Sequence, residues 1–523
     1  MTQPVEGPSS APPVELSRRR VFVIFGALLA AMFLSSLDQS VVGTALPTIV
    51  GDLGAAQNEG WIITAYLLAI AIVMPIYGKL GDLVGRRIPF LVAIALFVVG
   101  STGSALAGSF VDLILWRSVQ GLGAGGLVIL AQAVIADIVS ARERGKYMGP
   151  MGAVFGVATV TGPLLGGWFT QGPGWRWCFW TNVPIGLIAL GVAWFALKLP
   201  SHRPAHRFDL GGALLLATAT AGVVFLTSWT SLTGAAGYDW GDPGLLALTA
   251  GTLLAVAGFL VVESRVSDPI VPLRLFHSST FAVAAIIALS IGMAMFAALS
   301  FLPTFLQMAQ GVGATESGLL MLPMTIGILI TSLASGLLIT RTGHYKLYPI
   351  VGMGVATAAL AWLTLISAGM SMVLFGAMIF VLGLGLGAVL QTIVIAAQNS
   401  VPATQVGVAT STNNFLREIG AAVGTSAFST AFTTRLSTTL AEDMRQLPAS
   451  DVPAAFGARS LTPADVASLP ASVREAVVEA YTTSLAPSFW YLVPVAAVGF
   501  IAAFFMREIR LSDRAGLSAR ASS

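Results

Sequence analysis

Four charged side chains stand inside stretches of sequence that are otherwise apolar. Asp38 lies late in the first such stretch, Arg117 lies early in the fourth, and Arg417 and Glu418 are neighbours in the thirteenth. A charge inside an apolar stretch of membrane-spanning length is costly and is rarely kept without a use. A carboxyl group in a low-dielectric cavity takes up a proton more readily than one in water, and a nearby arginine helps to release it. Asp38 and Glu418 are therefore candidates for proton exchange, and Arg117 is a candidate partner that helps to release the proton. The alternative is that the four charges are paired structural ions, with Arg417 as a plain partner of Glu418.

The composition requires lipid as a solvent for much of the chain. Of its 523 residues, 56% are hydrophobic and only 10% are charged, and the mean hydropathy is +0.84. Soluble domains carry roughly 25% charged residues. The single cysteine, Cys178, excludes a disulfide framework, and the four histidines form no ligand-like cluster. We therefore expect an all-α polytopic membrane protein without a metal site or a cofactor.

Apolar stretches of about 20 residues predict fourteen membrane-spanning helices. They lie near 21–50, 59–78, 88–108, 111–136, 146–170, 176–198, 210–231, 244–263, 280–308, 316–340, 347–368, 371–398, 406–434 and 487–506. The first stretch is too long for the hydrophobic part of a signal peptide and is followed by further spans, so it is expected to remain as a helix. The polar segment 435–486 is expected to be a solvated extracellular connector, with a short surface helix over 472–485 as the alternative.

The positions of the basic residues predict the orientation of these helices. Of the 27 Lys and Arg residues, two lie within spans (Arg117 and Arg417) and five lie in loops on the side away from the N-terminus (Arg176, Arg435, Arg445, Arg459 and Arg474). The other 20 lie on the same side as the N-terminus. Because cytoplasmic loops are rich in Lys and Arg, both termini are predicted to be cytoplasmic, in a plasma or inner membrane.

An internal repeat divides the chain into two halves. Five glycines recur 262 residues later: Gly121, Gly123, Gly125, Gly145 and Gly162 match Gly383, Gly385, Gly387, Gly407 and Gly424. The predicted organisation is a disordered tail (1–20), a six-helix bundle (21–199), an inserted helix pair with flanking loops (200–279), a second six-helix bundle (280–506) and a C-terminal tail (507–523). Two related halves suit a transporter whose site lies between them near the middle of the membrane. None of the four intramembrane charges recurs at its repeat position, so the fold itself does not demand them.

The loop after the second predicted helix reads Gly78-Lys79-Leu80-Gly81-Asp82-Leu83-Val84-Gly85-Arg86-Arg87. Its glycines allow a tight turn and close approach of helices. Asp82 is expected to cap the N-terminus of a neighbouring helix, and Arg86 is expected to pair with Asp137. Together these contacts predict a cytoplasmic latch, and a solvated charge cluster is the alternative.

Uncharged polar residues supply candidates for the lining of a central cavity. Two i,i+4 pairs, Asn413 with Arg417 and Asn414 with Glu418, place two polar stripes on the thirteenth predicted helix. One stripe is expected to face the cavity. Three more candidates are Tyr66, Gln132 and Gln307, for which ordinary interhelical hydrogen bonding is the alternative.

Five motifs in order resemble those of the major facilitator superfamily, and in particular its fourteen-helix drug:proton antiporters. The loop 78–87 resembles the motif G-x-L-a-D-r-x-G-r-[kr], and 117–124 resembles the helix-4 motif R-x-x-q-G-x-g-a. The helix-5 antiporter motif g-x-x-x-G-P-x-x-G-G is matched by Gly162, Pro163, Gly166 and Gly167, with Ala158 in place of the leading glycine. Residues 37–47 and 175–186 are similar to the helix-1 and helix-6 signatures, with Gly43 where Asn is common.

This resemblance implies proton-driven export of lipophilic, often cationic, compounds. It implies that Asp38 is a coupling or cation-binding acid, that Arg117 is its partner and that an acid on the thirteenth helix, here Glu418, is a further site. The expected partners are a small-molecule substrate, protons and the lipid bilayer, with no nucleic acid and no obligate protein partner. An exporter of an endogenous metabolite, lipid or amino acid is the first alternative, and a non-transporting membrane receptor is the second. An enzyme is not expected, because no constellation of nucleophile, base or metal ligands appears. No Walker A sequence occurs either, which argues against a built-in ATP motor.

Overall fold

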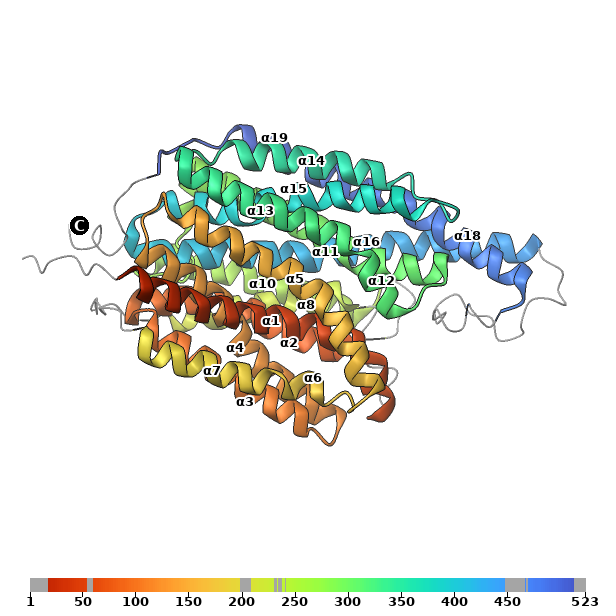
Figure 1. The fold of residues 1–523 in the computed structure, drawn as a ribbon, viewed down its shortest axis with the longest axis horizontal. Helices are drawn as coiled ribbons and strands as arrows, with labels where there is room; N and C mark the ends of the chain where they lie inside the picture. Colours follow the sequence, from red (N-terminus) through yellow and green to blue (C-terminus); the bar gives the residue numbers. More distant parts are fainter. Residues whose placement is uncertain are drawn as a thin grey trace, which may run out of the picture.

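The computed structural model describes residues 17–53, 60–197, 208–229, 233, 238–239, 241–446, 466 and 469–511. The predicted tail over 1–20 lies mostly outside these residues, as do parts of the segments 200–209, 447–468 and 507–523. Long helices lie side by side along the longest axis of the molecule (Figure 1). The end at which α1 begins also carries Arg86, Arg144 and Arg341, and we call it the basic end.

The helices have the following bounds. The first group is α1 (Arg18–Asp52), α2 (Gly60–Val84), α3 (Arg87–Leu106), α4 (Phe110–Ile138), α5 (Arg144–Gln171), α6 (Trp177–Trp180) and α7 (Asn182–Ala196). The next two are α8 (Leu210–Thr227) and α10 (Pro243–Arg265). The last group is α11 (Ser279–Gln310), α12 (Ala314–Leu320), α13 (Leu322–Thr342), α14 (Leu347–Leu363), α15 (Met372–Asn399), α16 (Val406–Gln446), α18 (Ala471–Ser488) and α19 (Leu492–Phe504). Short 3₁₀ turns precede α11, α16 and α19.

The first and last groups pack in the same pattern. α1 packs on α5 as α11 packs on α16, α2 on α4 as α13 on α15, α3 on α4 as α14 on α15, and α3 on α7 as α14 on α19. The repeated glycines explain this equivalence, because they let the backbones of equivalent pairs approach closely. A Cβ added at Gly121 would lie 2.5 Å from the Tyr66 carbonyl oxygen on α2, and one added at Gly383 would lie 2.0 Å from that of Met324 on α13.

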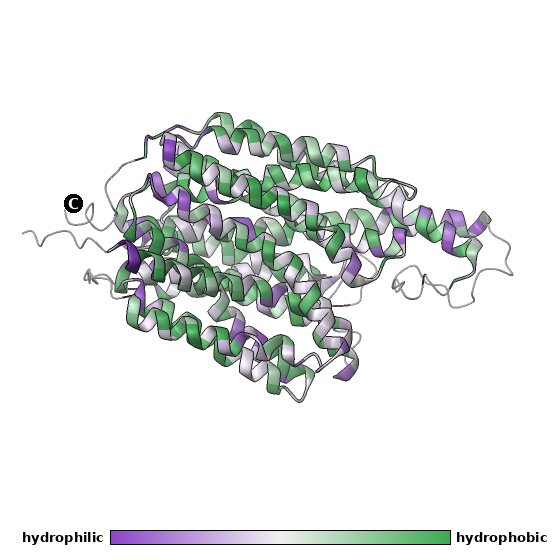
Figure 2. Cartoon of the chain, in the orientation of Figure 1, coloured by the Kyte–Doolittle hydropathy of each residue, from purple (hydrophilic) through white to green (hydrophobic). Residues whose placement is uncertain are grey.

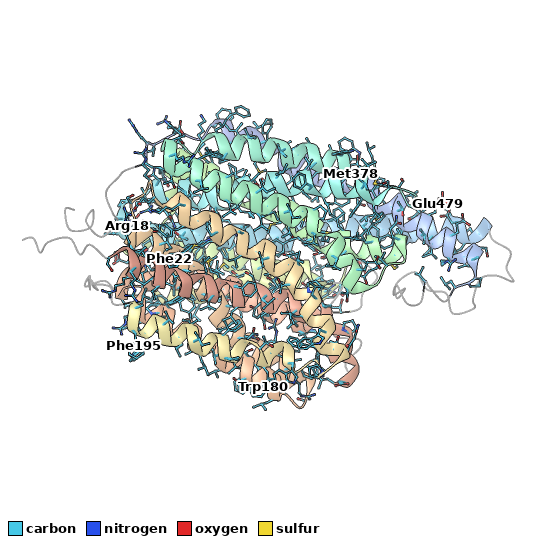
Figure 3. The ribbon with its side chains drawn as sticks, viewed as in Figure 1. Arg18, Phe22, Trp180, Phe195, Met378 and Glu479 are labelled. Carbon is cyan, nitrogen blue, oxygen red and sulfur yellow. The ribbon has the colours of Figure 1, made fainter. Side chains whose placement is uncertain are left out.

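The helices present apolar side chains to the surroundings. Phe22 and Phe195 are 72% and 74% exposed on the outer surface (Figure 3), and hydrophilic residues gather towards the two ends of the bundle (Figure 2). Within the described residues, twelve helices have the length and hydropathy of membrane spans. The other two predicted spans are α14, which has 17 residues, and the more polar α16. The chain is therefore a multi-pass membrane protein, and the total of fourteen spans stays a prediction.

The segment predicted as a solvated connector is largely helical where the structure describes it. α16 continues to Gln446, well past the predicted end near 434, and α18 packs against it. Val473, Val477 and Leu485 of α18 are fully or almost fully buried, and the two helices project beyond the rest of the bundle (Figure 1). The prediction of a connector was wrong, because an apolar face at helical spacing outweighs the polar average of the segment.

Candidate functional site

The two halves meet closely at the basic end. A Cβ on Gly145 of α5 would lie 2.4 Å from the Gly336 carbonyl oxygen of α13, and a Cβ on Gly407 of α16 would lie 2.7 Å from that of Gly78 on α2. Gly145 and Gly407 are repeat equivalents, so the same contact is made twice. Arg142 adds hydrogen bonds from Nε and Nη2 to the carbonyl oxygens at 340 and 341, at 3.0 and 2.8 Å. The basic end is therefore closed.

Asp82 joins the halves at this end. Its carboxylate accepts hydrogen bonds from the backbone N–H groups of Gly407 at 3.3 Å and Val408 at 2.8 Å, at the N-terminus of α16. A carboxylate at a helix N-terminus satisfies free N–H groups and interacts favourably with the helix dipole. Asp82 lies on α2 and α16 belongs to the other half, so the contact stabilises the closed arrangement.

Arg86 is buried between two carboxylates. It donates from Nη2 to Asp82 at 2.5 Å and from Nε to Asp137 at 3.1 Å. Burial acts to lower the pKa of the Arg86 guanidinium, but the two carboxylates outweigh it and raise this pKa above its ordinary value. Arg87 does not join them, because it donates to the Trp194 carbonyl oxygen and lies over that ring. The structure thus brings together Gly78, Asp82, Arg86 and Asp137 of the predicted latch, while Gly85 ends α2 with a φ of +88°.

A cavity of about 800 Å³ lies between the halves, away from the basic end. It is lined by the second half of α1, the first half of α2, the middle of α5, and parts of α8, α11, α12, α13 and α16. Its walls combine apolar side chains such as Phe155, Phe296 and Met321 with many hydroxyl groups. Among the described residues that line it, Glu418 is the only charged one.

Glu418 reaches the cavity from α16 and keeps one ionic partner. Arg417 donates from Nη2 to Glu418 Oε1 at 3.0 Å, and the exposed fractions of the two side chains are 4% and 14%. The Arg417 guanidinium also lies 5.5 Å from the centre of the Phe155 ring on α5. Glu418 is therefore a carboxylate that a substrate or a proton in the cavity can reach.

Asp38, by contrast, is sealed inside the first half. Its side chain is fully buried and forms an ion pair with Arg117 Nη1. Its Oδ1 also accepts hydrogen bonds from Gln120 Nε2 at 2.8 Å and Asn182 Nδ2 at 2.7 Å. The Arg117 guanidinium lies 3.9 Å from the centre of the Tyr66 ring. The predicted partnership of Asp38 and Arg117 is present, but Asp38 does not line the cavity.

Two polar partners of Asp38 were not singled out from the sequence. Gln120 lies one helical turn after Arg117 and accepts a hydrogen bond from it at 2.7 Å. Asn182 opens α7 and also donates to Ser101 Oγ at 3.1 Å. Both residues fall within the quoted helix-4 and helix-6 motifs. The signal that could have identified them is Asp38 itself, because a buried carboxylate needs more hydrogen-bond donors than one arginine supplies.

Most of the predicted cavity candidates lie elsewhere. Only Gln307 lines the cavity, where it donates to Ser317 Oγ at 3.1 Å. Tyr66 is buried and donates to the Ser35 carbonyl oxygen at 3.1 Å, and Asn413 donates to the Ala284 carbonyl oxygen at 3.1 Å. For Tyr66, the alternative interpretation of interhelical hydrogen bonding therefore describes the side chain. Asn413 is likewise bonded to a neighbouring helix, α11.

The remaining two candidates form an amide cluster that joins the halves. Gln132 of α4 accepts from Asn414 Nδ2 at 2.9 Å, and it donates to Gln391 Oε1 of α15 at 3.4 Å. All three side chains are buried. One polar stripe on α16 carries Asn414 and Glu418. It faces the contact between the halves at Asn414 and the cavity at Glu418. Asn413, on the other stripe, faces α11.

The glycines of the helix-5 motif hold α5 against α1 beside the cavity. A Cβ on Gly162 would lie 2.2 Å from Ser40 Oγ, and one on Gly166 would lie 2.8 Å from the Val41 carbonyl oxygen. Pro163 lines the cavity, and a Cβ on Gly167 would lie 3.0 Å from Thr315 Oγ1 of the second half. This motif therefore shapes the wall of the cavity through close packing.

Two repeated helical bundles, with a cavity between them that is closed at one end, define the architecture of a membrane transporter. The chain belongs to the major facilitator superfamily, whose profile matches residues 28–425. This membership identifies the protein as a transporter that acts on small molecules rather than an enzyme.

Curated relatives agree with this assignment. The chain is 39% identical over 500 residues to an uncharacterized MFS-type transporter of Mycobacterium tuberculosis, covering 95% of this chain and 71% of the relative. It is 34% identical to the multidrug transporter protein MdtP of Bacillus subtilis, with 95% and 94% covered. It is 30% identical to an efflux pump of Gibberella moniliformis, with 98% and 92% covered.

Solved structures share the fold. The human organic anion transporter MFSD10 matches with a TM-score of 0.60 at 14% identity, covering 92% of this chain and 99% of the other. A bacterial homologue of the human lysosomal transporter Spinster, in an inward-facing conformation, matches with a TM-score of 0.56 at 18% identity, covering 94% and 98%.

Proposed function

We propose that the protein is a proton-coupled antiporter that exports lipophilic cations by alternating access. The observation that carries this proposal is a single carboxylate, Glu418, in a cavity whose described lining is otherwise uncharged. A cation with an apolar body fits such a cavity, because its charge is attracted to Glu418 while its body contacts side chains such as Phe155 and Phe296. One relative is named for multidrug transport and another for efflux, which supports the export of drug-like compounds.

In this mechanism a proton and the substrate compete for Glu418. When the cavity faces outward, the carboxylate takes up a proton and a bound cation leaves. When it faces inward, the proton leaves and a new cation binds. Each unit of pH difference supplies about 1.4 kcal/mol per proton. The membrane potential acts only on net charge moved, so it adds nothing when one proton is exchanged for one monovalent cation. Export against a gradient then needs no nucleotide.

The basic end is assigned to the cytoplasm, because Lys and Arg gather in cytoplasmic loops. The arrangement described above is then an outward-facing state whose cytoplasmic latch is closed by Asp82, Arg86 and Asp137. In this state Asp38 is held by Arg117, Gln120 and Asn182. Asp38 therefore takes part in coupling only during the conformational change that separates it from these partners.

The test is transport in proteoliposomes with an imposed pH gradient and the cationic dye ethidium. Wild-type protein is expected to accumulate the dye, and Glu418→Gln is expected to lose gradient-driven accumulation. Glu442→Gln is the matched control, because Glu442 lies exposed on the same helix and away from the cavity. Equal accumulation by the Glu418→Gln and Glu442→Gln variants would refute the role of Glu418. Transport of neutral or anionic compounds but no cations would refute the substrate class.

A further inference from the structure

The helix pair inserted between the halves touches both of them. α8 packs on α10, and it also packs on α2 of the first half and on α16 of the second. We call the line along which α2 and α16 face each other the α2–α16 seam. α8 follows this seam from the basic end to the cavity.

Near the basic end, α2 and α16 meet directly and the insert packs over them. A Cβ on Gly78 of α2 would lie 2.0 Å from Ser411 Oγ of α16. An apolar cluster that includes Leu216 of α8 and Phe259 of α10 packs against Ile76 of α2 and Phe415 of α16. The insert is therefore anchored to both halves at this level.

At the level of the cavity, α8 itself becomes part of the wall. Val224, Thr227 and Ser228 line the cavity beside residues of α2 and α16. On one side of α8, Phe225 makes an edge-to-face contact with Trp61 of α2, with ring centroids 5.8 Å apart. On the other side, Ser426 Oγ of α16 donates to the Thr227 carbonyl oxygen at 2.6 Å.

The opposite seam, between α5 and the helices α12 and α13, is closed without an inserted helix. A Cβ on Gly156 of α5 would lie 3.1 Å from Thr325 Cγ2, and one on Gly318 of α12 would lie 2.9 Å from Pro163 Cβ. Small residues thus bring the two halves into direct contact along that side. The two seams differ, and only the α2–α16 seam places residues of the insert in the cavity wall.

We propose that α8 seals the α2–α16 seam against the lipid and forms one wall of the substrate chamber, with Val224 and Thr227 as specificity-determining residues. The substrate class, lipophilic cations, rests on the proposed function. The inserted pair thereby limits the bulk of the substrates that the chamber accepts.

The seal is tested by reaction with a membrane-impermeant maleimide applied to either face of proteoliposomes. Thr227→Cys is expected to react from one face, at a rate close to that of Thr430→Cys, which places a thiol on the α16 wall of the cavity. Leu214→Cys is the control on the lipid-facing side of α8, where the native side chain is 61% exposed, and it should not react. The wild type measures the background from the buried Cys178. A Thr227→Cys variant that is as unreactive as Leu214→Cys would overturn the proposal.

Specificity is tested with a bulky and a small lipophilic cation, tetraphenylphosphonium and phenyltrimethylammonium. Val224→Phe should raise the KM for the bulky cation about tenfold and leave that for the small one near its wild-type value, because overpacking penalises the larger guest. Leu214→Phe, which places the same aromatic ring on the lipid side of α8, should change neither. Equal effects on both cations would overturn the specificity role. If the wild type transports neither cation, the proposed function fails, while the labelling still decides whether α8 is a wall.

Discussion

The ion pair between Asp38 and Arg117 should have a large coupling free energy, because both side chains are almost completely buried. In Asp38→Asn, an amide NH₂ replaces the carboxylate oxygen that faces the guanidinium, so two donors point at each other and a buried positive charge loses its partner. Removing one member of a buried pair costs about 3–5 kcal/mol. Coulomb's law gives a similar figure, about 4 kcal/mol at about 4 Å in an effective dielectric of 20.

A double-mutant cycle measures this coupling directly. The variants are Asp38→Asn, Arg117→Gln and the double variant, each unfolded with SDS in mixed micelles and followed by tryptophan fluorescence. Each single variant should be destabilised by about 3–5 kcal/mol. The double variant should recover most of that loss, since no unpaired buried charge remains, and Glu442→Gln should behave like the wild type.

A small coupling would contradict this reasoning. Exposed ion pairs typically contribute about 0–1 kcal/mol. A cycle that gives a value in that range would mean that water reaches Asp38 in the resting protein. Asp38 would then be as accessible as Glu418, and the separate roles proposed for the two acids would not hold.

Two further predictions concern the latch. Asp82→Asn should lower the maximal transport rate and leave the substrate Kd within about twofold of the wild-type value. The reason is that this change weakens the contact with α16 by about 0.5–2 kcal/mol and does not alter the cavity. A raised Kd with a normal transport rate would count against the latch. Gly407→Val should open the basic end, since its Cβ would lie 2.7 Å from the Gly78 carbonyl oxygen. This opening should appear as faster labelling of a cysteine placed at Ser411, and unchanged labelling would show that the two helices do not need close contact there.

Much of the fold could be predicted, because hydropathy and glycine spacing are properties of short stretches of the sequence. Each apolar stretch of membrane-spanning length corresponds to a helix where the structure describes it. The glycine repeat predicted the equivalence of the halves, since Gly121 of α4 and Gly383 of α15 each allow close approach of the neighbouring helix. Local breaks within spans were missed: α6 and α7 are separated at Thr181, and α12 and α13 at Met321.

The site was predicted less completely, because it depends on which side chains meet in space. The charges of Asp38, Arg117 and Glu418 are visible in the sequence through their cost in an apolar stretch. Neither the sealing of Asp38 nor the exposure of Glu418 to the cavity follows from that cost. Uncharged amides give an even weaker signal, so Asn182 was missed and Gln132 was assigned to the cavity rather than to an inter-half contact.

The central claim, that a proton and a cationic substrate compete for Glu418, is tested most directly by proton release on binding. Tetraphenylphosphonium is titrated into detergent-solubilised protein in buffers of different ionisation enthalpy, over a series of pH values. We expect binding to the wild type and to Glu442→Gln to release protons, and binding to Glu418→Gln to release none. Equal proton release from the Glu418→Gln and Glu442→Gln variants would contradict this claim.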